Sequence, residues 1–207
     1  NPFISHLNNL LLHGIVVVLV FFFFRNLGLS IAEAFLGALI FAIHPSKVEP
    51  VAWVSERKEL LYTVFYMASL LSYQKSRFLS SLFFTFLSLL ANPMAVSLPL
   101  VMLLIDWFRG QGWGLKAVIN KWPYFLLFAV VIAGARLVLF GHPPIQILQT
   151  PLIWIWSLVF YIQKFFIPVV FEPLYTLPQP VGLFSSAYVV SLVFLAGLLT
   201  MMGFFRK

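Results

Sequence analysis

One short stretch of the chain, HPSKVEPVAWVSERKELL at residues 44 to 61, concentrates charge in an otherwise apolar sequence. Only 9% of all residues are charged, yet three of the six acidic residues and three of the 13 cations fall here. These six residues are Lys47, Glu49, Glu56, Arg57, Lys58 and Glu59. A solvated connector with local ion pairs is one interpretation, although exposed pairs contribute only about 0 to 1 kcal/mol to stability. The other interpretation is a chemical role.

The chemical role that fits these residue types is the handling of a phosphorylated lipid and a hydroxyl acceptor at a membrane surface. Cations neutralise phosphate oxygens, and a carboxylate accepts the proton of a hydroxyl or orients it. We therefore expect Arg57 and Lys58 to bind the lipid phosphate. Glu49 and Glu56 are the candidate catalytic carboxylates. His44 stands at an expected helix end, where it could orient Glu49 or contact phosphate, and it completes the catalytic candidates.

Five further polar residues lie within apolar segments, where an unpaired polar group is costly. His6, Asn9 and His13 are spaced i, i+3, i+7 and so share one helical face. They either fix helix packing by hydrogen bonds or contact the lipid phosphate. Arg136 and Lys164 either extend to the membrane interface or hold that phosphate from the side. No spacing resembles a zinc site, so no metal ligands or cofactor are expected, with a divalent cation as the open alternative.

The elements that must position these residues are membrane helices. The 207 residues are 62% hydrophobic with a mean hydropathy of +1.01, more than a soluble core requires. Apolar runs of helical length predict an all-α integral membrane protein, a polytopic bundle of about seven to eight transmembrane or re-entrant helices. The expected helices are 5–24, 30–44, 58–74, 78–91, 94–108, 122–140, 151–170 and 186–205. The absence of cysteine excludes disulfides and thiolate chemistry.

The cations between these helices predict the orientation. If the chain reverses at each boundary, six of them fall on one face, with no acidic residue in the same loops. They are Arg25, Lys75, Arg77, Arg109, Lys116 and Lys121. The positive-inside rule makes this face cytoplasmic and the 45–57 segment external. The net charge of +7 therefore reflects topology rather than nucleic-acid binding, and Asp106 is expected to form an interfacial cap or ion pair at the cytoplasmic end.

Prolines interrupt two of the apolar regions. Pro93, in ANPM, divides residues 78–108 into two short helices that meet at a bend. Four prolines between residues 168 and 180 predict an extended loop near the membrane surface. Because Lys164 lies just before that loop, a full crossing and a re-entrant or interfacial helix both remain open for residues 151–170.

Four blocks of this sequence occur in the order seen in bacterial multi-spanning glycosyltransferases that often carry C-terminal tetratricopeptide repeats. The blocks are NPFISHLNNLLLH, HPSKVEPVAWVSERKELL, ANPMAVSLPLVMLLIDWF and YIQKFFIPVVFEPLYTLPQP. The chain resembles this family over nearly its whole length, and the family is similar to the TMTC protein O-mannosyltransferases of animals. The second block is the most specific. Its matching residues are His44, Pro45, Glu49, Ala52, Trp53, Glu56, Arg57, Lys58 and Glu59.

The resemblance implies a GT-C-like fold and one transmembrane glycosyltransferase-like domain over residues 1–207. It implies transfer of a sugar, such as mannose, from a polyprenyl-phosphate donor to a hydroxyl, with protein Ser or Thr favoured over a glycan. The site would face outward from a bacterial inner membrane, and the partners would be membrane lipid, donor and acceptor, without nucleic acid.

The resemblance also predicts features that this chain lacks. A first helix and an outer loop with the acidic catalytic base are expected upstream, so the chain is interpreted as a fragment, and the repeats are absent. Asn92 replaces the usual Lys of its block. A truncated or degenerate glycosyltransferase that serves as a non-catalytic lipid-binding or assembly module is the alternative. A transporter is disfavoured because matching pairs of broken helices are absent from the sequence.

Overall fold

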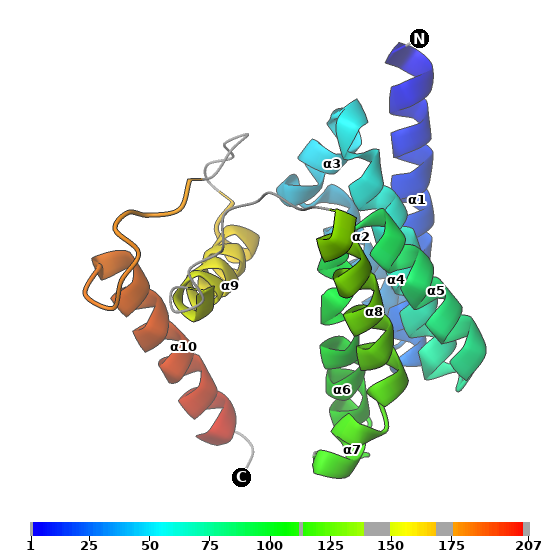
Figure 1. Cartoon of the computed structure of the whole chain (residues 1–207). Coiled ribbons are helices and arrows are strands. Elements are labelled where there is room, and N and C mark those ends of the chain that lie inside the picture. The colour runs from blue at the N-terminus through cyan, green and yellow to red at the C-terminus, as the bar shows by residue number, and fades with distance from the viewer. Residues whose placement is uncertain (1, 112–113, 139–149, 169–175, 205–207) are drawn as a thin grey trace. The chain divides into compact units, whose positions relative to one another are not determined.

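A computed structural model describes residues 2–111, 114–138, 150–168 and 176–204. Within these ranges the chain is helical and contains no strand, which confirms the all-α class. It divides into two compact units, Asn1–Phe140 and Gly141–Lys207, and each is described by itself (Figure 1). That residues 1–207 act as a single glycosyltransferase-like domain stays a prediction.

Each of the eight expected helices has a counterpart in the structure. The long helices of the first unit are α1 (Pro2–Asn26), α2 (Ile31–Ile43), α4 (Arg57–Gln74), α5 (Phe78–Ala91), α6 (Leu98–Phe108) and α8 (Trp122–Val138). Short helical pieces join them: η1 (Pro45–Lys47), α3 (Val48–Ala52), η2 (Val54–Glu56), η3 (Pro93–Ser97) and α7 (Leu115–Ile119). The second unit holds α9 (Thr150–Phe166) and α10 (Ser186–Phe204).

Local sequence explains where several helices begin. Ser30 and Glu33 form a capping box at the start of α2, in which the Ser30 backbone N–H donates to the Glu33 carboxylate at 2.7 Å. Asn92 caps η3, because its Oδ1 accepts a hydrogen bond from the Met94 N–H at 2.8 Å. The expected helix over 94–108 therefore starts later, at Leu98, after a 3-10 turn.

The core of the first unit lies where α4, α5, α6 and α8 meet. Its buried side chains include Leu70, Leu89, Met102 and Phe128, one from each of these helices. A smaller cluster of Val16, Val20 and Ala38 holds α2 against α1.

A seam of buried hydroxyl groups joins α4 to α5. Ser69 Oγ lies 2.8 Å from Thr85 Oγ1 and donates to the Ser81 carbonyl at 3.0 Å. From α8, the Tyr124 hydroxyl donates to Ser81 Oγ at 2.9 Å. Small hydroxyl residues at a helix contact let the backbones approach closely and supply hydrogen bonds that do not need water, as in many membrane bundles.

The surface of the first unit is apolar. Large side chains of α1 that point away from the bundle include Phe3, Leu10, Leu11 and Phe22, each more than half exposed. Among the described residues one helix, Phe3–Asn26, is long and apolar enough to cross a membrane. The bent pair Ile31–Ile43 and Pro45–Ala52, which turns by 57°, would be a second. The other apolar helices are shorter, so the expectation of seven to eight spans stays a prediction.

In the second unit α9 packs against α10. The Trp156 ring of α9 lies 6.4 Å from the Tyr188 ring of α10, measured between centroids, and the Tyr188 hydroxyl donates to the Pro178 carbonyl at 3.0 Å. Residues 176–185 form no helix or strand, as the prolines predicted, whereas 169–175 lie outside the described residues.

Candidate functional site

The charged block folds as three short helical pieces rather than as an open loop. The pieces η1, α3 and η2 follow one another from Pro45 to Glu56, and α3 and η2 contact α1. In Figure 1 they lie near the N-terminal end of α1, and α7 lies at the opposite end of the same unit. The helical pieces carry Lys47, Glu49 and Glu56, and the first turn of α4 carries the other three charges of the block.

Asn9 attaches this block to α1. Its side chain is fully buried, and Nδ2 donates to the carbonyls of Trp53 at 3.0 Å and Val51 at 3.3 Å. Its Oδ1 accepts a hydrogen bond from Arg57 Nε at 3.2 Å. The Asn9 amide is therefore fully engaged with the protein, and its predicted contact with lipid phosphate remains untested.

Arg57 is held beside α1 by a second contact, from Nη2 to the Ser5 carbonyl at 3.5 Å. A guanidinium has five N–H groups. These two contacts use Nε–H and one Nη2–H, so three N–H groups remain that could bind phosphate oxygens.

The histidines of the predicted set differ in their surroundings. His13 is buried, and its Nε2 lies 3.1 Å from the Ala42 carbonyl, so this nitrogen carries the proton. Its Nδ1 is buried without a hydrogen-bond partner in the described part of the chain. His44 caps η1, where its Nδ1 accepts from the Ser46 N–H at 3.2 Å. His6 is exposed.

Two residues of the block, Lys47 and Glu59, form a second polar group with Asn92. The Lys47 ammonium lies 4.8 Å from the centroid of the Phe41 ring. Burial lowers the pKa of Lys47, and the nearby negative charge of Glu59 offsets part of this effect. Asn92 Nδ2 donates to Glu59 Oε1 at 2.5 Å. The residue that replaces the usual Lys is thus bound to a carboxylate of the block.

Of the remaining charges of the block, Glu49 and Lys58 are exposed and Glu56 is half-buried. Glu49 lies on α3 with an exposed side chain, and no described residue forms a hydrogen bond or an ion pair with its carboxylate. Lys58 Nζ and Glu56 Oε1 form an ion pair at 3.7 Å. An exposed carboxylate and an exposed cation within one short segment are groups that can receive a substrate hydroxyl and a phosphate.

For two predicted phosphate ligands, Arg136 and Lys164, the structure gives no contact with the charged block among the described residues. Arg136 lies in α8, and its side chain is outside the described part of the chain. Lys164 belongs to α9 of the second unit, where its Nζ lies 5.5 Å from the Phe160 ring centroid. The roles of both stay predictions. In the described ranges no three His, Asp or Glu side chains gather as a metal site would require.

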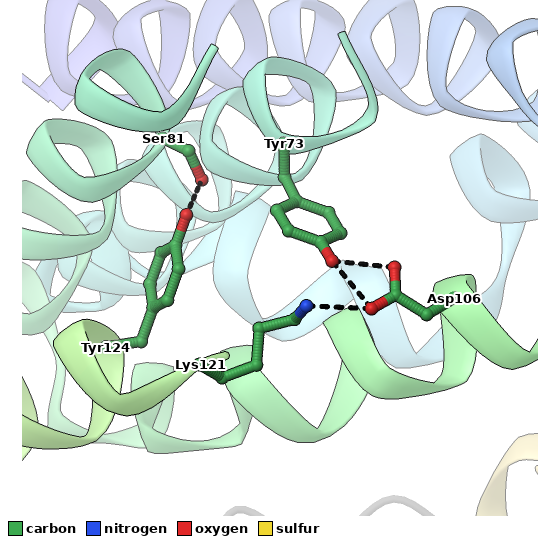
Figure 2. A network of polar contacts seen from close by, with 5 residues as sticks. All are labelled: Tyr73, Ser81, Asp106, Lys121 and Tyr124. Atoms are coloured by element: carbon green, nitrogen blue, oxygen red, sulfur yellow. Dashed lines mark hydrogen bonds and ion pairs between the residues drawn. The ribbon is translucent and has the colours of Figure 1, made fainter. Parts of the chain in front are cut away.

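A second polar network lies toward the other end of the first unit, where Asp106, Lys121 and Tyr73 converge (Figure 2). Lys121 Nζ pairs with Asp106 Oδ2 at 2.7 Å, and both side chains are buried. The Tyr73 hydroxyl lies 2.6 Å and 2.8 Å from the two Asp106 oxygens. The expected ion pair of Asp106 is therefore confirmed, and Tyr73 is a member that the sequence did not reveal.

Comparison with known proteins gives relatives of one kind. The mouse "Protein O-mannosyl-transferase TMTC3" is 29% identical over 159 residues, which cover 72% of this chain and 16% of the relative. The mouse "Protein O-mannosyl-transferase TMTC1" is 37% identical over 81 residues, or 37% of this chain and 8% of the relative. Human TMTC3 is 37% identical over 76 residues. No family model matches the chain. No solved structure matches it either.

These similarities support a relationship to protein O-mannosyltransferases and a glycosyltransferase role. The chain covers only 8% to 16% of the length of the curated relatives that it matches.

Proposed function

We propose that this chain is the membrane-bound part of a GT-C-like glycosyltransferase. It moves a sugar, such as mannose, from a polyprenyl-phosphate donor to a protein Ser or Thr hydroxyl at the outer face of a bacterial inner membrane. The observation that carries the proposal is the charged block, which Asn9 and Arg57 fix at one end of an apolar helical unit. Similarity to named O-mannosyltransferases supports the reaction class.

Insertion in lipid follows from the exposed apolar surface. Soluble proteins rarely expose apolar patches larger than a few hundred Å². Here α1 alone presents a continuous row of exposed aliphatic and aromatic side chains, from Phe3 to Phe22. In a bilayer this surface contacts acyl chains. A polyprenyl tail would lie among the same chains, with its phosphate at the level of the charged block.

The block has residues for each part of the transfer. The cations Arg57 and Lys58 bind the donor phosphate, and their charge stabilises the phosphate as it leaves the sugar. As the acceptor oxygen bonds to the anomeric carbon, the bond from that carbon to the phosphate oxygen breaks. Glu49 accepts or orients the acceptor proton, with Glu56 as the second carboxylate.

The remaining predicted residues support these groups. His44 positions the turn that precedes Glu49, through its contact with the Ser46 N–H. Asn9 and His13 hold α1 against the block and against α2. His6 contacts the donor phosphate from the exposed side of α1.

The decisive experiment is transfer of labelled mannose from a polyprenyl-phosphate donor to a Ser/Thr-rich peptide. The complete natural protein that contains this chain is compared with residues 1–207. Transfer by the complete protein is the expected result. If the complete protein binds the donor but transfers no sugar to the peptide, the chain is instead a non-catalytic lipid-binding or assembly module.

This module is the second candidate function. One observation favours it, because Arg57 makes two hydrogen bonds to groups of α1, as a purely structural arginine would. Donor binding without transfer is its signature.

A further inference from the structure

A second candidate binding site lies at the end of the first unit opposite the charged block. Two pockets there share Asp106 and Gln111 in their walls. One has a volume of about 150 Å³ and is bounded also by Arg109. The other has a volume of about 420 Å³ and is bounded also by Lys116 and Lys121. Three of the cations expected on one membrane face, Arg109, Lys116 and Lys121, thus line these two adjoining pockets, which are together called the depression.

The positive charge of this depression is only partly neutralised. Asp106 and Lys121 compensate each other in their buried ion pair, and Tyr73 satisfies the carboxylate further (Figure 2). Arg109 donates to the backbone carbonyls of Gln74 at 3.2 Å and Asn26 at 2.9 Å, and no carboxylate of the described residues forms an ion pair with it. Lys116 is exposed, and no acid in the described ranges pairs with it. Two cations therefore remain for an anionic ligand.

Exposed aromatic and apolar residues stand next in sequence to residues that line the depression. Trp107 and Trp122 are exposed next to Asp106 and Lys121, respectively, and Leu115 of α7 is 77% exposed. Exposed Trp beside Lys and Arg is typical of the level of lipid headgroups, where the ring has one apolar and one polar environment. A ligand held here would have its phosphate in the depression and its apolar part beside these side chains.

We propose that this depression binds the phosphate of an anionic phospholipid headgroup, with Lys116 and Arg109 as its cationic ligands. The site rests on the membrane insertion proposed above, but not on sugar transfer. A free phosphate has the same chemistry, so the test must separate the two sources.

The test titrates the purified chain in neutral detergent with phosphatidylglycerol or phosphatidylcholine and counts bound lipid by native mass spectrometry. We expect tighter binding of phosphatidylglycerol, and a loss of about fivefold in its affinity in Lys116→Gln, because a basic residue near anionic lipid contributes about that factor. Lys75→Gln is the matched control, since Lys75 is an exposed cation at the same end that does not line either pocket. Its affinity should change less than twofold.

Inorganic phosphate is added in a third arm. If millimolar phosphate displaces phosphatidylglycerol from the wild type, the depression is an anion site for soluble phosphate, and the assignment to a phospholipid is overturned. Equal affinity for the two lipids, or equal losses in Lys116→Gln and Lys75→Gln, would overturn the proposal. Neither variant removes a buried contact, so both should unfold at the wild-type temperature. Because no sugar donor is present, the result is independent of the proposed transfer.

Discussion

Arg57 Nε donates a hydrogen bond to Asn9 Oδ1 at 3.2 Å, joining two residues that are 48 positions apart in the sequence. The same asparagine donates to two carbonyls of the charged block, so one buried amide fixes both the backbone of the block and its arginine. The position of the Arg57 guanidinium therefore depends on α1.

Asn9→Ala should lower the free energy of unfolding by about 1 to 3 kcal/mol, because it leaves buried polar partners without hydrogen bonds. Asn8→Ala is the control, since Asn8 is the exposed neighbour on the same helix. Chemical unfolding of both variants in detergent measures the difference. If the two alanine variants prove equally stable, Asn9 does not anchor the block.

Arg57→Ala should reduce donor affinity and sugar transfer by the complete protein, and Arg57→Lys should recover only part of the loss. Lysine keeps the charge but lacks the fork that binds two phosphate oxygens. Arg136→Ala is expected to reduce transfer as well. Donor binding and turnover are measured at equal protein concentration. Wild-type affinity and rate in both alanine variants would remove these residues from the phosphate site.

Glu49→Gln should lower transfer by about 100-fold or more if its carboxylate accepts the acceptor proton, because glutamine keeps the size but cannot act as the base. Glu33→Gln provides the comparison, since Glu33 caps α2 and has no predicted catalytic role. Initial rates and unfolding temperatures of the two variants are compared. Equal rates in wild type and Glu49→Gln would assign Glu49 to structure alone.

Asp106→Asn should cost about 3 to 5 kcal/mol of stability, because it leaves the buried Lys121 charge unpaired. Tyr73→Phe should cost about 1.5 to 3 kcal/mol, the usual value for a hydrogen bond to a charged group. Unfolding curves test both values. In the double variant Asp106→Leu/Lys121→Met much of the stability should return, and a double variant less stable than Asp106→Asn would contradict this account.

Cysteine labelling tests the orientation, and the absence of native cysteine makes every introduced thiol unique. An impermeant reagent added to intact cells should label Ser46→Cys, in the charged block, but not Ser76→Cys, at the turn between α4 and α5. The physical reason is that cations are in excess at the end of the first unit that holds the turn between α4 and α5, and such an end stays on the cytoplasmic side. Labelling of Ser76→Cys but not of Ser46→Cys would show that the chain has the reverse orientation.

The sequence predicted the long helices well because continuous apolar runs extend over many residues. It predicted a loop for residues 45–57, where the structure has η1, α3 and η2. Pieces of three to five residues that contain Pro45 and Pro50 have too little periodicity to be recognised. The start of α6 was misplaced for a similar reason, since the proline-initiated η3 continues smoothly into it.

The roles of the candidate site residues stay predictions, and the structure adds contacts that the sequence did not predict. The spacing of His6, Asn9 and His13 indicated a shared face, but only Asn9 and His13 are buried. The spacing of residues along a helix predicts which helical face a side chain occupies, but not which segment packs against that face. The contacts of Asn9 with Val51 and Trp53 could therefore not be predicted. Tyr73 was missed because a tyrosine in an apolar helix has no pattern that distinguishes a hydrogen-bonded residue.

The hydroxyl seam between α4 and α5 has a consequence for biogenesis. Ser69, Ser81 and Thr85 bind each other through short contacts within one helical hairpin, and these contacts do not depend on the release of water. We therefore expect α4 and α5 to associate as soon as both have entered the bilayer, while later helices are still being synthesised. The charged block ends in the first turn of α4, so its final residues would be anchored at the membrane surface from that moment.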